Sequence, residues 1–100
     1  MGERVLFKPG RVGATATAFL MLCAAAGPEG DPRNLIVDLV LRHISGDWGD
    51  VAPEQVARNT RALQIGGRVI SVHRVMPQVS IRVVTETERG RTIVMENSDP

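Results

Sequence analysis

Side chains capable of chemistry gather in residues 43–50, which combine one of the two histidines, the single tryptophan and two aspartates around two glycines. His43 lies four residues before Asp47, and because Gly46 ends the helix between them, we expect the carboxylate to turn back, either to cap backbone N–H groups or to pair with the imidazole. Such a pair can hold one ring tautomer for general acid–base chemistry. It can equally be a polar plug that closes a helix corner, with Trp48 packed over it. We favour the plug, because the sequence places no nucleophile beside the pair.

The elements around this segment are predicted to be helices. Asp31 followed by Pro32 is typical of an N-cap and first helical residue, and Gly46 ends the helix that begins there. His43 falls on the apolar side of this helix, where an unbonded ring would cost about 1 to 3 kcal/mol. A third helix spans roughly 53–64 and turns Asn59 towards the core. We expect Asn59 to tie down the 46–50 loop or a strand end, with a pocket-lining role as the alternative.

An earlier helix is apolar on every side. Thr15 or Thr17 can cap it, its body is residues 19–26, and Gly27 with Pro28 ends it. A helix of this kind is normally buried by other elements or covered by a partner.

The remainder of the chain alternates apolar and polar residues as strands do. In residues 68–75, Ile70 and Val72 share one face, and His73 lies on the other. Two further strands follow, near 79–85 and 91–95, and a fourth can come from residues 4–7 or 11–12. We predict an α+β fold, in which about three N-terminal helices (about 15–65) pack on a C-terminal antiparallel sheet of three to four strands (about 68–96).

Composition narrows the classes of function. A chain of 100 residues with 43% hydrophobic content predicts a single small domain, 1–100, and a formal charge of +1 gives no overall attraction to nucleic acid or anionic lipid. The sequence contains no phosphate loop or paired-cysteine motif, so we expect neither a cofactor nor a metal. The lone Cys23 fits a reducing cytoplasm. Basic residues before the apolar run 14–26 resemble a secretory signal, but Thr15 and Thr17 dilute the run, and we expect no export and no membrane span.

Several motifs together resemble a family of short, uncharacterised bacterial, plasmid and phage proteins. The match covers most of the chain and includes Gly10-Arg11-Val12, the H-x-x-G-D-W-G motif that begins at His43, Asn59 with Ala62-Leu63, residues 67–71, and Thr85-Glu86 with Arg89 and Thr92. Members are often labelled "type I restriction endonuclease subunit M" or "plasmid-related protein". The resemblance implies a mobile-element setting and a structural motif made of His43, Gly46, Asp47, Trp48, Gly49 and Asn59.

The resemblance does not supply an activity. A methyltransferase subunit needs a cofactor-binding domain that a chain of this length lacks, so the restriction label carries no weight. Where the family commonly has a tyrosine two positions after Ser71, this chain has His73 and no tyrosine at all.

Three functions remain open. The first is a non-enzymatic interaction or regulatory module that binds a protein partner or a second copy through its apolar helix. The second is a small toxin-like RNase, which requires an exposed His73 beside arginines on one concave sheet face. The third is a nucleic-acid-binding module that uses the arginine-bearing strand face, which the near-zero charge does not favour. The candidate catalytic residues of the second are His43, Asp47, His73, Arg74, Arg82 and Arg89.

Overall fold

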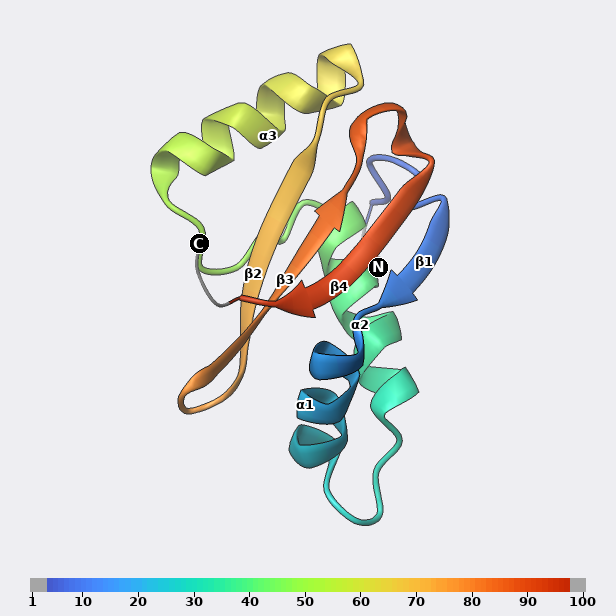
Figure 1. The fold of residues 1–100 in the computed structure, drawn as a ribbon. Coiled ribbons are helices and arrows are strands. Elements are labelled where there is room, and N and C mark those ends of the chain that lie inside the picture. Colours follow the sequence, from blue (N-terminus) through green and yellow to red (C-terminus); the bar gives the residue numbers. More distant parts are fainter. Residues whose placement is uncertain (1–3, 98–100) are drawn as a thin grey trace.

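The computed structural model describes residues 4–97 and shows the predicted α+β layout, with three helices before the main strands (Figure 1). The elements are β1 (Arg11–Ala14), α1 (Ala16–Ala26), α2 (Pro32–Ile44), α3 (Pro53–Ile65), β2 (Val69–Met76), β3 (Val79–Thr85), the short 3₁₀ helix η1 (Thr87–Arg89) and β4 (Arg91–Glu96).

The predicted helix starts are confirmed. The hydroxyl of Thr15 accepts a hydrogen bond from the N–H of Ala18, and the carboxylate of Asp31 accepts one from the N–H of Arg33. Each interaction satisfies a backbone donor that the first turn leaves free. The third helix begins at Pro53, where a missing N–H costs nothing.

The sheet is mixed, which corrects the prediction of a purely antiparallel one. Its strand order is β1-β4-β3-β2; β2, β3 and β4 form the predicted antiparallel meander, whereas β1 pairs with β4 in parallel. The fourth strand is therefore 11–14, one of the two predicted candidates. A parallel pairing is possible because the whole helical half and two strands separate β1 from β4, so no hairpin constrains its direction.

The two faces of the sheet differ in what covers them. Figure 1 views the face that α1 and α2 leave free, with α2 behind the sheet. The covered face carries buried residues of all three antiparallel strands, such as Val69, Ile81 and Val94. Together with Leu22 of α1 and Leu39 of α2 they belong to the hydrophobic core. We call the other side the open face.

The outer edge of β2 is covered by α3 and by the chain that precedes it. The side chain of Asn59 donates to the carbonyl of Ile70 at 2.8 Å and accepts from its N–H at 3.0 Å, as a neighbouring strand would. Two residues along, Val72 pairs with the backbone of Trp48 and Asp50. Asn59 therefore ties down a strand, as predicted, and an otherwise unpaired sheet edge is satisfied.

None of the helices within residues 4–97 combines the length and the hydropathy that a membrane span requires.

Candidate functional site

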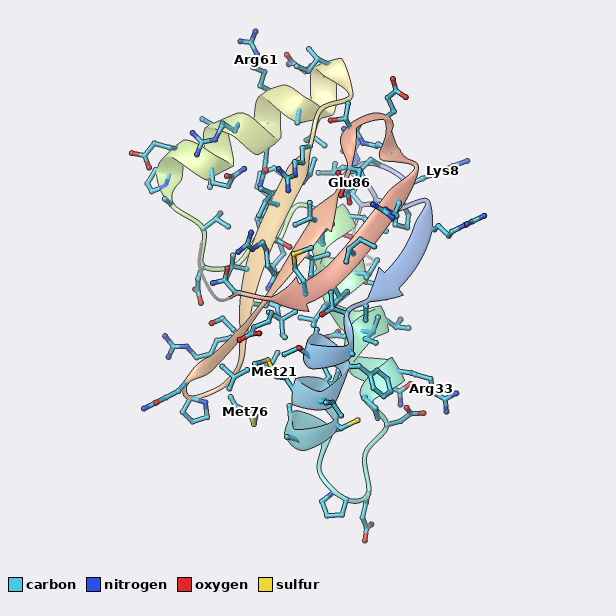
Figure 2. The ribbon with its side chains drawn as sticks, viewed as in Figure 1. Lys8, Met21, Arg33, Arg61, Met76 and Glu86 are labelled. Atoms are coloured by element: carbon cyan, nitrogen blue, oxygen red, sulfur yellow. The ribbon has the colours of Figure 1, made fainter. Side chains whose placement is uncertain are left out.

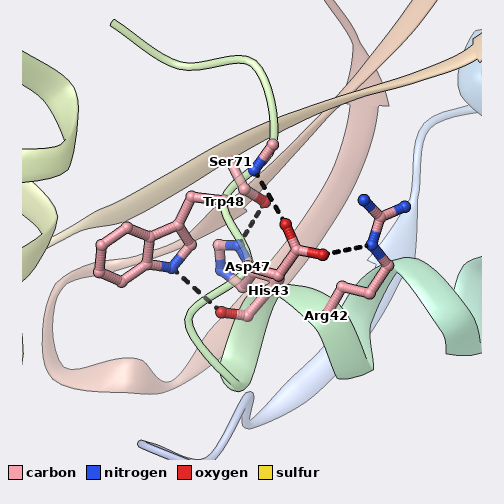
Figure 3. Close-up of polar contacts among 6 residues, drawn as sticks. Arg42, His43, Asp47, Trp48 and Ser71 are labelled. Atoms are coloured by element: carbon pink, nitrogen blue, oxygen red, sulfur yellow. Dashed lines mark hydrogen bonds and ion pairs between the residues drawn. The ribbon is translucent and has the colours of Figure 1, made fainter. Parts of the chain in front are cut away.

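The H-x-x-G-D-W-G segment closes the C-terminal end of α2. Gly46 adopts a φ of +94° and donates to the carbonyl of His43, while the N–H of Asp47 donates to the carbonyl of Arg42. This hydrogen-bond pair is a Schellman motif, which uses carbonyls that the last helical turn leaves free. The indole of Trp48, half-buried against the core, adds a further donor to the His43 carbonyl at 3.2 Å (Figure 3). Trp48 therefore packs at the C-terminal end of α2.

His43 is completely buried, and both of its ring nitrogens are hydrogen-bonded. Nδ1 lies 2.6 Å from the hydroxyl of Ser71 on β2, and Nε2 lies 2.9 Å from the hydroxyl of Thr85 on β3. The ring of Phe7 packs edge-on against the imidazole, with centroids 5.6 Å apart. The imidazole thus links α2 to two strands and to the N-terminal segment.

The hydrogen bonds continue beyond Thr85 and determine where the imidazole proton lies. Thr92 donates to the carbonyl of Pro9, which can only accept, at 2.7 Å. Its oxygen must then accept from Thr85, 2.7 Å away. Since the hydroxyl of Thr85 already donates its one proton to Thr92, it must accept from His43. The proton of the neutral ring is therefore on Nε2, and Nδ1 accepts from Ser71.

Burial keeps this imidazole neutral. It lowers the pKa of His43 to about 4, and the nearby His73 contributes further lowering. A ring whose nitrogens face only hydroxyls, inside a sealed core, is suited to holding elements together. It has no access to a substrate, so it cannot exchange protons with one.

Of the two roles expected of the Asp47 carboxylate, pairing with His43 is wrong and capping of a backbone N–H is observed. The Oδ2 atom of Asp47 accepts from Nε of Arg42 at 2.8 Å, and its Oδ1 atom accepts from the N–H of Gly49 at 3.3 Å (Figure 3). The turn at Gly46 directs the carboxylate towards the surface, where about half of the side chain is exposed. The guanidinium of Arg42 holds the pKa of Asp47 below its usual range.

Residues 48–50 form a strap along the edge of β2. Trp48 accepts from the N–H of Val72 at 3.1 Å, and Asp50 donates to the carbonyl of Val72 at 2.8 Å. Gly49 lies between them with a φ of +68°. A Cβ at this position would collide with the Val72 carbonyl and lie 2.8 Å from Nδ1 of His73. The strap therefore needs glycine for both its conformation and its close approach to β2.

His73 lies beneath this strap, on the helix-covered face, and is 2% exposed. Neither ring nitrogen has a hydrogen-bond partner among residues 4–97. Burial lowers its pKa and Arg42 acts in the same direction, whereas the carboxylates of Asp47 and Asp50 oppose the shift. The exposed histidine that the RNase hypothesis requires is therefore absent from position 73.

The candidate phosphate-binding arginines do not meet at either histidine. Arg74 and Arg82 lie on the open face, on the opposite side of the sheet from His73. Arg89 donates to the carbonyl of Ala62 at 2.9 Å and lies over the ring of Phe7. The six residues proposed as catalytic thus divide between a buried network, a surface ion pair, two sheet faces and the turn at η1. This separation follows from strand alternation, because neighbours in sequence point to opposite faces.

Several residues of the site were missed by sequence reasoning. The strand alternation places Ser71, Thr85 and Thr92 on the buried face. Their hydroxyls could have indicated the network, because a hydroxyl in the core needs a hydrogen-bond partner. Phe7 and Arg42 had no comparable signal.

Within residues 4–97, no group of three or more His, Cys, Asp or Glu side chains could hold a metal ion.

Comparisons with protein-family models, curated proteins and solved structures found no match to this chain. The resemblance to the short bacterial, plasmid and phage proteins therefore stays a prediction.

Proposed function

We propose that the protein is a small non-enzymatic interaction module that pairs with a second copy of itself through the outer surface of α1 and α2. The carrying observation is the exposure of large apolar side chains there: Leu20 is 68% exposed and Val37 is 57% exposed. Leu41 follows Val37 by one helical turn, and Phe19 adjoins Leu20; both are also exposed. We call these four residues the helical patch.

The chemistry of the patch favours self-association. Single exposed apolar residues are ordinary on a monomer, but four on two helices that pack together are costly to leave in water. An isologous contact covers the same surface on both copies and needs no complementary charge. The patch also agrees with the all-round apolar character of α1, only two of whose residues, Ala18 and Leu22, are buried.

The buried site supports a binding role over a catalytic one. The histidines, which are the most versatile acid–base groups in the chain, are both sealed in the core. We also propose that the protein acts in the cytoplasm. The alternative partner is a protein of a phage, a plasmid or the host.

The test is the molar mass in solution, measured by size-exclusion chromatography with light scattering over a range of concentrations. The wild-type chain has a mass of 10.8 kDa, and we expect a dimer of twice that mass. A Leu20→Glu/Val37→Glu variant is expected to be monomeric with unchanged circular dichroism. Ile65→Glu is the control, because Ile65 is 67% exposed at the end of α3, outside the patch. A wild-type monomer at all concentrations, or equal dissociation by the control, would refute self-association.

A further inference from the structure

The open face of the sheet gathers positive charge that the composition conceals. Strand pairing puts Arg11 beside Arg91, and it puts Arg74 diagonally next to Arg82. Diagonal neighbours in antiparallel strands lie about 7–8 Å apart. Arg58 of α3 joins them at the rim, where it lines the same groove as Arg82. A net charge of +1 thus coexists with one strongly basic face.

These five arginines have no acidic partner among residues 4–97. The ion pairs in that range join Arg33 to Asp31 and Arg42 to Asp47, both on α2 or at its ends. On the open face, Nε of Arg82 donates to the side-chain carbonyl of Asn97 at 3.2 Å. Within residues 4–97 its two terminal nitrogens make no hydrogen bond, and their planar arrangement suits a phosphate.

A groove lies between α3 and this face. It has a volume of about 330 Å³, with Ile70 and Val72 as its floor and Arg58 and Arg82 among its lining residues. The bidentate contact between Asn59 and Ile70 holds α3 in place, so the groove is already formed. Its wall includes the start of α3, whose N-cap residue makes no side-chain hydrogen bond.

Two carboxylates moderate the positive potential. Asp50 lines the groove, and Glu86 is bonded through its backbone to Arg91 at the far end of the face. Five arginines against these two acids leave the face basic, which predicts moderate and salt-sensitive binding.

We propose that the open face binds single-stranded nucleic acid, with Arg58 and Arg82 on the backbone phosphates and the bases against the aliphatic floor. Guanidinium groups neutralise phosphates and also stack on bases, which suits a surface without aromatic residues. A volume of about 330 Å³ is small against a double helix, so we expect the groove to take a single strand. Binding is independent of base sequence, because few groups on this face can read base edges.

The position of the apolar residues favours nucleic acid over an anionic membrane. The most exposed apolar side chains of α1 and α2, Leu20 and Val37, lie on the helical side of the molecule. The aliphatic residues of the open face, such as Ile70 and Val72 of β2, are half-buried. A membrane-binding surface needs apolar groups that protrude beside its basic ones. This inference does not depend on self-association, which uses the other side.

The experiment measures fluorescence anisotropy of labelled 12-nucleotide oligo(U) and oligo(dT) with the full chain at 50, 100 and 200 mM NaCl. Arg58→Gln/Arg82→Gln is expected to weaken binding at least tenfold and to lower the slope of log K against log salt by about 0.7 for each lost phosphate contact. Arg61→Gln is the matched control. Like Arg58→Gln, it removes one positive charge from α3, but Arg61 projects away from the sheet (Figure 2), and its effect is expected to stay within twofold.

Four outcomes would overturn the inference. The first is no binding of the wild type at 50 mM NaCl, and the second is an equal loss of affinity in the Arg61 control and the double variant. The third is tighter binding to a duplex of the same length. The fourth is binding to vesicles with anionic lipid but not to either oligonucleotide. We expect equal affinity for oligo(U) and oligo(dT). A preference for one of them would identify RNA or DNA as the natural ligand. Circular dichroism verifies that each variant is folded.

Discussion

Nε2 of His43 donates to the hydroxyl of Thr85 across 2.9 Å, and this hydrogen bond connects α2 to a chain of hydroxyls that ends at the carbonyl of Pro9. Thr85 is the residue on which the chain depends, because its hydroxyl accepts from the ring and donates to Thr92. Removing the Thr85 hydroxyl therefore takes a partner from both His43 and Thr92. Such a network specifies a single arrangement of the core.

Replacement of Thr85 by valine tests this network. Thr85→Val keeps the shape of the side chain but leaves the Nε2–H of His43 without an acceptor, so we expect the free energy of unfolding to fall by about 1 to 3 kcal/mol in urea denaturation. Thr85→Ser retains the hydroxyl and is expected to lose less. Equal stability of the valine variant and the wild type would show that the chain contributes nothing.

The buried imidazole makes stability depend on pH. The pKa of His43 is about 4 in the folded chain and 6.5 in the unfolded one, so only the unfolded chain binds this proton between those values. Stability from this group is complete above pH 6.5 and is lost as pH falls towards 4. We expect the free energy of unfolding, extrapolated to water from urea denaturation, to fall by about 3 kcal/mol over this pH range. The lowered pKa of His73 acts in the same direction.

A titration by NMR separates this effect from acid denaturation in general. The ring nitrogens of His43 are expected to show the Nε2–H tautomer down to about pH 5, with Nδ1 unprotonated. A ring that titrates near its ordinary pKa in the folded protein would contradict the buried network.

Gly49→Ala is expected to be strongly destabilising. A left-handed backbone costs roughly 1–2 kcal/mol for a residue with a Cβ, and here the Cβ also collides with the Val72 carbonyl, so the strap must leave β2. Gly66→Ala is the control, because φ is +78° there, yet its Cβ would meet only ordinary contacts. We expect about 1 kcal/mol for the control and at least twice that loss for Gly49→Ala in thermal and urea unfolding.

Asp47→Asn is expected to change the free energy of unfolding by less than about 1 kcal/mol. It removes an exposed ion pair with Arg42, an interaction that is worth little in water. The asparagine carbonyl can still accept from the N–H of Gly49. A loss as large as that of Thr85→Val would restore a structural role for a negative charge near His43. Urea denaturation at pH 7 in low and high salt is the measurement.

Trp48 contributes both packing and a hydrogen bond. Trp48→Ala is expected to cost about 3 kcal/mol, at the lower end for large core residues, because the indole is only half-buried. Trp48→Phe keeps most of the ring but not the donor to the His43 carbonyl, and should cost about 1 kcal/mol beyond the volume change. A loss below about 1 kcal/mol for the alanine variant would indicate an exposed recognition residue.

The helices and their ends could be predicted from local signals. Thr15, Asp31 and Pro53 mark helix starts because capping and the missing proline N–H act within one turn. The alternation in 69–76 also identified which residues of β2 share a face. These features are determined by neighbours in the chain, so the sequence alone is sufficient for them.

The partners of the polar residues could not be predicted in the same way. His43 was correctly placed in the core, but Asp47, the nearest candidate in sequence, is turned outwards by Gly46, and the actual partners are 28 and 42 residues away. The direction of β1 and the grouping of arginines on the open face depend likewise on strand order. Local periodicity determined that His43 needed partners, and only the tertiary structure decided which hydroxyls would supply them, because distant strands meet α2 only when the sheet packs against it.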